Sequence, residues 1–163
     1  IRPFNCVGVG EEDALGEKVV YSGNVKMMMS HVLPDLIHKA LSLNADDPFP
    51  ILGDGSQVRH YTNGIDIARG IRLALESKKG LNNDFNISTD VKTSVTELAY
   101  IVWNKIHNKN PVLQECPAYN YDVQLRSPDV TKARMLLGFS ADMSLSDSVD
   151  EVVEYMRNKN GQV

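Results

Sequence analysis

The sequence predicts a fold in which α-helices alternate with β-strands, of α/β or α+β class. Short apolar segments bounded by glycine or proline recur along the chain, and segments with apolar residues at helical spacing lie between them. The 163 residues contain no internal repeat, low-complexity tract or dividing linker. At this length we expect a single domain, residues 1–163, with one sizeable core that includes Tyr61 and Trp103.

Five segments have the length and apolar content of β-strands. They are 1–7, 49–52, 57–61, 85–88 and 112–115. The first is apolar in alternation and is followed by Gly8 and Gly10, which indicates a buried strand that ends in a turn. The turn Gly53-Asp54-Gly55 separates the second strand from the third.

Five further segments carry apolar residues at helical spacing and are predicted as helices. They are 30–43, 65–77, 94–106, 130–137 and 146–158. Ser94 and Glu97 have the spacing of a capping box at the start of the third helix. Ser30, Asp66 and Asp129 are placed to cap other helix starts, as serine and aspartate commonly do.

Composition and charge exclude several classes of function. The formal charge of −4 and the isoelectric point near 5.5 argue against a broad nucleic-acid surface, which needs massed Lys and Arg. No apolar stretch approaches the ~20 residues of a membrane span. Cys6 and Cys116 show no spacing typical of zinc ligands, so we expect no metal, reduced thiols and a cytoplasmic location.

Six phrases, in register over nearly the whole chain, resemble the carboxyl-terminal half of the NAD-dependent epimerase/dehydratase family, the extended short-chain dehydrogenases. The phrases are Arg2-Pro3-Phe4-Asn5, the run GDGSQVRHY at 53–61, DIARGI at 66–71, FNIS at 85–88, the helix start at 94–98, and PDVTKAR at 128–134 leading to Leu137-Gly138-Phe139. Any one phrase is weak evidence, whereas their order and spacing together are specific.

The resemblance implies late Rossmann elements at about 1–8 and 65–90, with a small mixed α/β lobe that binds a nucleoside-diphosphate sugar. NAD or NADP would be bound mainly by an amino-terminal half. Because Ile1 already lies in a strand-like run, we expect the chain to be part of a longer polypeptide. The GxxGxxG loop and the catalytic Tyr/Lys pair would then lie upstream, this chain would be inactive alone, and the full-length protein would form a homodimer.

The resemblance assigns the first three binding residues as follows. Arg59 corresponds to the arginine that grips the diphosphate, and its guanidinium fork suits two linked phosphates. Asn5 follows the first strand, where open α/β sheets place ligand contacts, and is assigned to substrate. Phe4 is assigned to the neighbourhood of the nicotinamide. The alternatives are a surface salt bridge for Arg59, a turn residue for Asn5 and a core position for Phe4.

Three further residues complete the predicted site. Asp122 matches a carboxylate that holds the ribose hydroxyls in epimerases, and Arg126 resembles an arginine that the family's decarboxylases keep before a Pro-Asp pair. Many epimerases carry an arginine slightly earlier, where this sequence has Tyr119. His31 lies where family members present a side chain to the diphosphate or the sugar. Asp122 and Arg126 could instead belong to a solvated loop, and His31 could be packed or solvent-facing.

Two functions follow from these assignments. The first is the nucleotide-sugar-binding portion of an NAD(P)-dependent sugar epimerase or dehydratase. The alternative is a stand-alone, non-catalytic nucleotide-sugar-binding or assembly module. A module of that kind would bind nucleotide sugars without requiring NAD.

Overall fold

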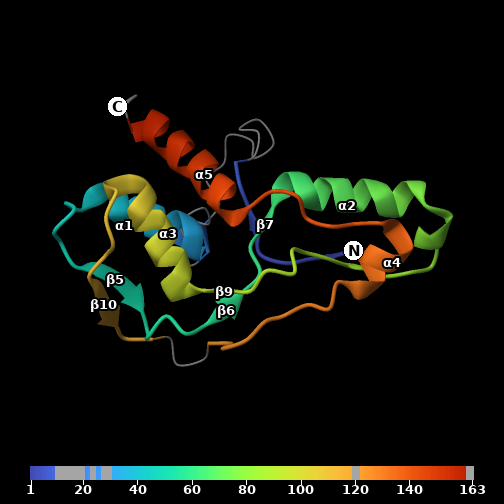
Figure 1. The fold of residues 1–163 in the computed structure, drawn as a ribbon, viewed down its shortest axis with the longest axis horizontal. Helices are drawn as coiled ribbons and strands as arrows, with labels where there is room; N and C mark the ends of the chain where they lie inside the picture. Colours follow the sequence, from blue (N-terminus) through green and yellow to red (C-terminus); the bar gives the residue numbers. More distant parts are fainter. Residues whose placement is uncertain (10–20, 23–24, 27–30, 119–121, 161–163) are drawn as a thin grey trace. The chain divides into compact units, whose positions relative to one another are not determined.

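The computed structural model describes residues 1–9, 21–22, 25–26, 31–118 and 122–160, and its helices and strands are shown in Figure 1. The chain divides into two compact units. Unit 1 comprises Ile1–Gly8, Gln57–Thr93 and Val123–Ser148; unit 2 comprises Val9–Ser56, Ser94–Asp122 and Val149–Val163. Both units contain helices and strands, so the predicted mixed α/β class is confirmed.

Unit 1 contains two parallel strand pairs. Strand β1 (Arg2–Pro3) pairs with β8 (Asn86–Ile87), and β2 (Cys6–Val7) pairs with β7 (Thr62–Asn63). The prediction of one continuous strand over 1–7 is therefore wrong. The chain breaks at Asn5, whose φ of 37° is a left-handed conformation that asparagine tolerates better than most residues. This break allows the segment to change partners.

The helices of unit 1 pack over these strands. Helix α2 (Gly64–Glu76) is followed by the short 3-10 helix η3 (Lys78–Gly80), and α4 (Thr131–Leu137) comes later in the chain. The buried core cluster consists of Ile67, Phe85, Ile87, Ala133, Leu137 and Phe139. Gly70 of α2 allows a close approach, since a Cβ there would lie 2.5 Å from Cγ2 of Ile87.

Asp66 is not the helix cap that the sequence indicated. Asn63 caps α2 by accepting a hydrogen bond from the backbone N–H of Ile65. The buried Asp66 instead pairs with Arg69 at 2.7 Å and accepts a hydrogen bond from the backbone N–H of Met143. Burial acts to raise the pKa of the Asp66 carboxyl, but Arg69 and the backbone donors outweigh it and lower the pKa.

Asp129 is not the N-cap of α4, a position held by Val130, but it contacts the start of the helix from one residue earlier. Its carboxylate accepts a 2.9 Å hydrogen bond from the backbone N–H of Thr131, the first residue of α4. That bond satisfies one of the donors that a helix start leaves without an intrahelical partner. The Thr131 hydroxyl and, to a smaller extent, this backbone N–H lower the pKa of the Asp129 carboxyl.

Unit 2 contains the parallel strands β5 (Phe49–Leu52) and β10 (Leu113–Cys116) and the antiparallel pair β3 (Tyr21–Ser22) and β4 (Val25–Lys26). Helices α1 (Val32–Ser42) and α3 (Val95–His107) lie beside β5 in Figure 1. Helix α5 (Leu145–Asn160) begins in unit 1 and continues into unit 2 from Val149.

The core of unit 2 is built around Trp103, which is fully buried and lies 4.6 Å from Phe49 between ring centroids. Tyr61 of unit 1 is 5% exposed, so both aromatic residues predicted for the core are confirmed there. The capping box of Ser94 and Glu97 is also present. Helix α1 is different from the prediction: its N-cap position is His31 rather than Ser30, and Ser30 lies outside the described residues.

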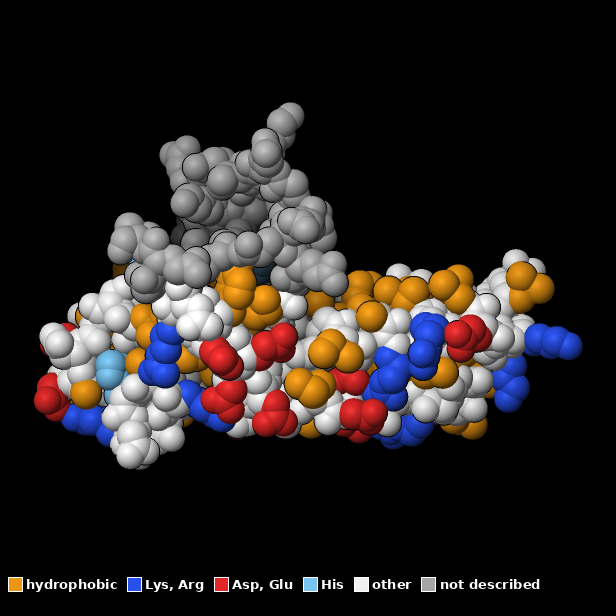
Figure 2. Space-filling model, turned by 90° about the horizontal axis from the view of Figure 1, so that it is seen from above, with side chains coloured by type: hydrophobic (Ala, Val, Ile, Leu, Met, Phe, Trp, Pro, Cys, Tyr) orange, Lys and Arg blue, Asp and Glu red, His pale blue; other side chains and the backbone are white. Residues whose placement is uncertain are grey.

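The remaining strands are β6 (Val58–Arg59) and β9 (Thr93–Ser94), the latter where the chain passes from unit 1 to unit 2. Among the described residues, no helix is long and apolar enough to cross a membrane. Figure 2 shows one face of the molecule, on which both basic and acidic side chains are visible among the described residues.

Candidate functional site

The backbone of residues 58–62 holds three distant parts of unit 1 together. The N–H of Val58 donates to the carbonyl of Gln124 at 2.8 Å, and the N–H of Arg126 donates to the carbonyl of Val58 at 3.2 Å. On the other side, the N–H of Thr62 donates to the carbonyl of Asn5 at 3.1 Å. These backbone bonds therefore link the segments that carry three of the predicted binding residues, Asn5, Arg59 and Arg126.

Arg59 is half-buried on β6. Its Nη1 donates a 2.9 Å hydrogen bond to the carbonyl of Val58, which holds the guanidinium close to its own backbone. Two residues on, Tyr61 is close enough to be affected by this charge. Burial raises the pKa of the Tyr61 phenol to about 12, and the positive charge of Arg59 opposes the rise.

Asn5 and Arg126 differ in how their side chains are held. The Asn5 amide donates from Nδ2 to the backbone carbonyl of His60 at 3.3 Å, and this bond holds the half-buried Asn5 side chain against residue 60. Arg126 is exposed, and its segment is anchored by the backbone bonds to Val58. Phe4, predicted beside the nicotinamide, is half-buried next to Asn5 in the break between β1 and β2.

A cavity of about 280 Å³ in unit 1 was missed by the sequence reasoning. Tyr61 lines it together with Thr89, Thr93, Asp142 and Ser144. The Tyr61 hydroxyl is buried and has no hydrogen-bond partner among the described residues. Burying a hydroxyl without a hydrogen-bond partner costs on the order of 1–3 kcal/mol of folding stability. Such an unsatisfied group is uncommon in a folded protein.

His60 was also missed as a site residue. It is 2% exposed, and both ring nitrogens contact polar atoms, Nδ1 at 2.9 Å from the carbonyl of Thr89 and Nε2 at 3.0 Å from Oγ of Ser127. The only sequence signal was a histidine directly after Arg59 in a strand-like segment. Nothing in that pattern indicates the two partners, which lie 29 and 67 residues away.

The other two predicted residues belong to unit 2. His31 is exposed at the N-cap position of α1 and makes no capping hydrogen bond with its side chain. Asp122 is exposed and is the last residue of unit 2 before the chain enters unit 1. Their assignment to the binding site remains a prediction, and Tyr119 lies outside the described residues.

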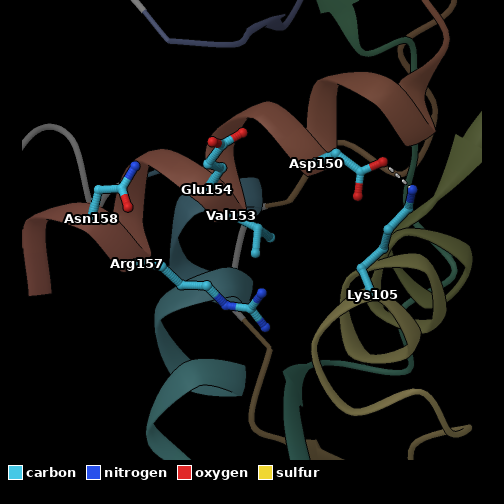
Figure 3. A pocket seen from close by; sticks show the side chains of 6 residues that line it. All are labelled: Lys105, Asp150, Val153, Glu154, Arg157 and Asn158. Carbon is cyan, nitrogen blue, oxygen red and sulfur yellow. Dashed lines mark hydrogen bonds and ion pairs between the residues drawn. The ribbon is translucent and has the colours of Figure 1, made fainter. Parts of the chain in front are cut away.

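Unit 2 has a cavity of its own, of about 320 Å³, beside α3 and α5 (Figure 3). Its lining residues are Lys105, Asp150, Val153, Glu154, Arg157 and Asn158. Lys105 forms an ion pair with Asp150. Since two carboxylates accompany the two cations and none of the predicted residues lines this cavity, it is a poor match for a dianionic ligand.

Comparison with known proteins identifies the family. Residues 1–88 match the model of the NAD dependent epimerase/dehydratase family. The chain belongs to this family. It is 32% identical over 112 residues to a putative UDP-glucose 4-epimerase of Methanocaldococcus jannaschii, covering 68% of this chain and 34% of that protein. It is 28% identical over 113 residues to UDP-glucuronic acid decarboxylase 2 of Arabidopsis thaliana, covering 69% of this chain and 25% of that protein.

Among solved structures, the chain resembles the UDP-glucuronic acid 4-epimerase of Bacillus cereus in complex with UDP-glucuronic acid and NAD. The TM-score is 0.74 at 25% identity, with 97% of this chain and 44% of that chain covered. The Rossmann-type α/β fold expected from the sequence is thereby confirmed. The chain spans between a quarter and a half of the length of these relatives.

One spacing in the chain bears on the catalytic pair of this epimerase/dehydratase family. Although we expected the pair upstream of Ile1, a Tyr-x-x-x-Lys spacing also occurs at Tyr155 and Lys159. Both residues lie in α5, in unit 2, and outside residues 1–88 that match the family model. Tyr155 is half-buried in that helix. We therefore assign this pair no catalytic role.

Proposed function

We propose that this chain is the nucleotide-sugar-binding portion of an NAD(P)-dependent sugar epimerase or dehydratase. Arg59 and Arg126 bind the diphosphate of the substrate, and Asn5 binds a phosphate oxygen or a sugar hydroxyl. One observation carries the proposal: the N–H of Arg126 donates to the carbonyl of Val58, so the two arginines lie on adjacent, hydrogen-bonded segments.

The chemistry of a diphosphate fits this arrangement. Two linked phosphates carry several negative charges within a few ångströms, and a guanidinium can bind each through paired N–H donors. Bonds of this kind are roughly twice as strong as those between neutral groups. The complex of the Bacillus cereus relative with UDP-glucuronic acid and NAD supports a nucleoside-diphosphate sugar as the ligand class.

The remaining predicted residues have supporting roles in this proposal. Asp122 accepts hydrogen bonds from the ribose hydroxyls, and His31 contacts the diphosphate or the sugar. Phe4 contacts the nicotinamide of NAD(P). The sequence contains no GxxGxxG spacing, so we propose that the dinucleotide loop and the catalytic Tyr/Lys pair belong to a preceding amino-terminal half.

In this arrangement, segments 1–8 and 65–90 are late elements of the Rossmann domain. The parallel pairing of β1 with β8 and the packing of α2 against β8 support that role, because a helix commonly connects parallel strands in such domains. The contribution of this chain to catalysis is orientation. Binding energy from the remote nucleotide holds the sugar in line with the nicotinamide.

Titration of UDP-glucose into the chain by calorimetry tests the proposal. Arg59→Ala should weaken binding about 10- to 100-fold, since it removes charge-assisted hydrogen bonds worth about 1.5–3 kcal/mol. The matched control is Arg72→Ala, because Arg72 is an exposed arginine of unit 1 whose side chain faces Glu76 of the same helix. Unchanged affinity in Arg59→Ala would refute the diphosphate assignment.

A further inference from the structure

His60 lies at the centre of the candidate site without being one of its predicted binding residues. Its ring is buried, and its backbone carbonyl accepts the hydrogen bond from the Asn5 amide. It directly follows Arg59 in the chain. Through Ser127, which directly follows Arg126, its ring reaches the segment that carries the second arginine. His60 is therefore linked to all three proposed binding residues. Asn5 is hydrogen-bonded to it and Arg59 precedes it in the chain, while Arg126 precedes its hydrogen-bond partner Ser127.

The two ring contacts fix the arrangement of the imidazole. The carbonyl of Thr89 can only accept a hydrogen bond, so Nδ1 carries the proton in the 2.9 Å contact. In the neutral ring Nε2 is then an acceptor, and the hydroxyl of Ser127 donates to it at 3.0 Å. Because the first contact orients the ring, the second holds Ser127 at a defined position.

The segment that carries Arg126 is hydrogen-bonded to residues 58–60. Residues 122–127 are all exposed, so no buried side chain among them anchors this stretch. The hydrogen bonds of this stretch to residues 58–60 include two backbone bonds at Val58 and the contact of the Ser127 hydroxyl with the His60 ring. The Ser127 contact joins two side chains, and it lies one residue beyond Arg126.

We propose that His60 is a positioning residue: through Ser127, its ring sets the separation of Arg59 and Arg126 so that both engage one diphosphate. The inference rests on the proposed function and deepens it. A single phosphate needs only one guanidinium, whereas two linked phosphates need both at a fixed separation. The His60–Ser127 contact therefore favours nucleoside diphosphates over nucleoside monophosphates.

The test compares the affinities of UDP and UMP, the latter measured by competition with UDP. Ser127→Ala should weaken UDP binding about fivefold, the effect of one hydrogen bond, and change UMP binding less than twofold. Ser140→Ala is the matched control, since Ser140 is an exposed serine of unit 1 whose hydroxyl donates to the nearby Asp142. It should leave both affinities unchanged.

A second variant addresses the ring itself. His60→Asn keeps a donor near the position of Nδ1 but cannot reach Ser127. The double variant His60→Asn/Ser127→Ala should therefore bind UDP no more weakly than His60→Asn alone, because both changes remove the same contact. Should His60→Asn fail to fold, Ser127→Ala decides the question by itself.

The outcomes separate the two proposals. The positioning role is overturned if Ser127→Ala has the same ratio of UDP to UMP affinity as the wild type, whether both affinities are unchanged or both fall equally. If Arg59→Ala weakens UDP binding while Ser127→Ala does not, only this inference fails. If Arg59→Ala also binds UDP like the wild type, the proposed function fails with it.

Discussion

The carboxylate of Asp66 accepts a 3.0 Å hydrogen bond from the backbone N–H of Met143, which lies 77 residues later in the chain. It also accepts hydrogen bonds from the N–H of Asp142 and from Arg69, which in turn binds the carbonyl of Ser140. Residues 141–145 form one wall of the cavity that Tyr61 lines. One buried carboxylate thus fixes the loop beside that cavity.

Replacing this carboxylate should cost stability. Asp66→Asn keeps the size of the side chain but places an amide donor against backbone donors. We expect the free energy of unfolding to fall by about 2 kcal/mol, the effect of leaving buried polar groups unsatisfied. Urea denaturation measures the loss. Asp84→Asn is the control, because Asp84 is exposed and forms exposed ion pairs with Arg2 and Lys132, and it should change stability little.

The lowered pKa of Asp66 predicts the direction of the pH dependence. A carboxyl with a folded-state pKa below its ordinary value of 3.8 stabilises the fold above the unfolded-state pKa. That contribution is lost as the pH falls through the folded-state pKa. Thermal melting should therefore show stability declining below about pH 4. The decline should be shallower in Asp66→Asn, and an identical slope in both proteins would contradict the assignment.

Gly70 should not tolerate a side chain. A Cβ at this position would lie 2.5 Å from Cγ2 of Ile87 and 3.1 Å from Phe139, too close for buried neighbours to accommodate without moving. Gly70→Ala should lower the free energy of unfolding by about 1–3 kcal/mol despite the better helix propensity of alanine. In Gly70→Ala/Ile87→Ala the loss should be smaller than the sum of the two single losses. Strict additivity would show that the two positions do not clash.

Arg126 should contribute to ligand binding through its fork of donors as well as its charge. Arg126→Ala should weaken UDP binding about tenfold, whereas Arg126→Lys should recover only part of the loss because an ammonium lacks the paired donors. Arg134→Ala serves as the control, since Arg134 is exposed in the same unit and paired with Asp90. Calorimetric titration at two salt concentrations measures both effects, and wild-type UDP affinity in the lysine variant would reduce the role of Arg126 to charge.

Local signals in the sequence were sufficient for most elements of the fold. The strand at 49–52 and the capping box of Ser94 and Glu97 were predicted as the structure has them, because each is encoded within a few consecutive residues. The contact between Asp129 and the start of α4 is equally local, although the N-cap itself is Val130. Interactions of this range can be inferred from spacing alone.

Features that depend on distant partners could not be inferred in this way. The partner change at Asn5 follows from pairing with two strands that come much later in the chain, and Asp66 acts on a loop that spacing does not connect to it. In the candidate site, the family phrases indicated Arg59 and Arg126. The buried ring of His60 that links their segments became visible only in three dimensions.

The pairing of β1 with β8 has a consequence for synthesis on the ribosome. Arg2 finds its neighbour only when Asn86 has been made, which at 5–20 residues per second takes on the order of 4 to 17 s. During that interval β1 lacks its partner β8, and the edge that β8 later covers remains open to chaperones or to association with other nascent chains. Completion of this unit is therefore a late event in translation, set by the order in which its segments emerge.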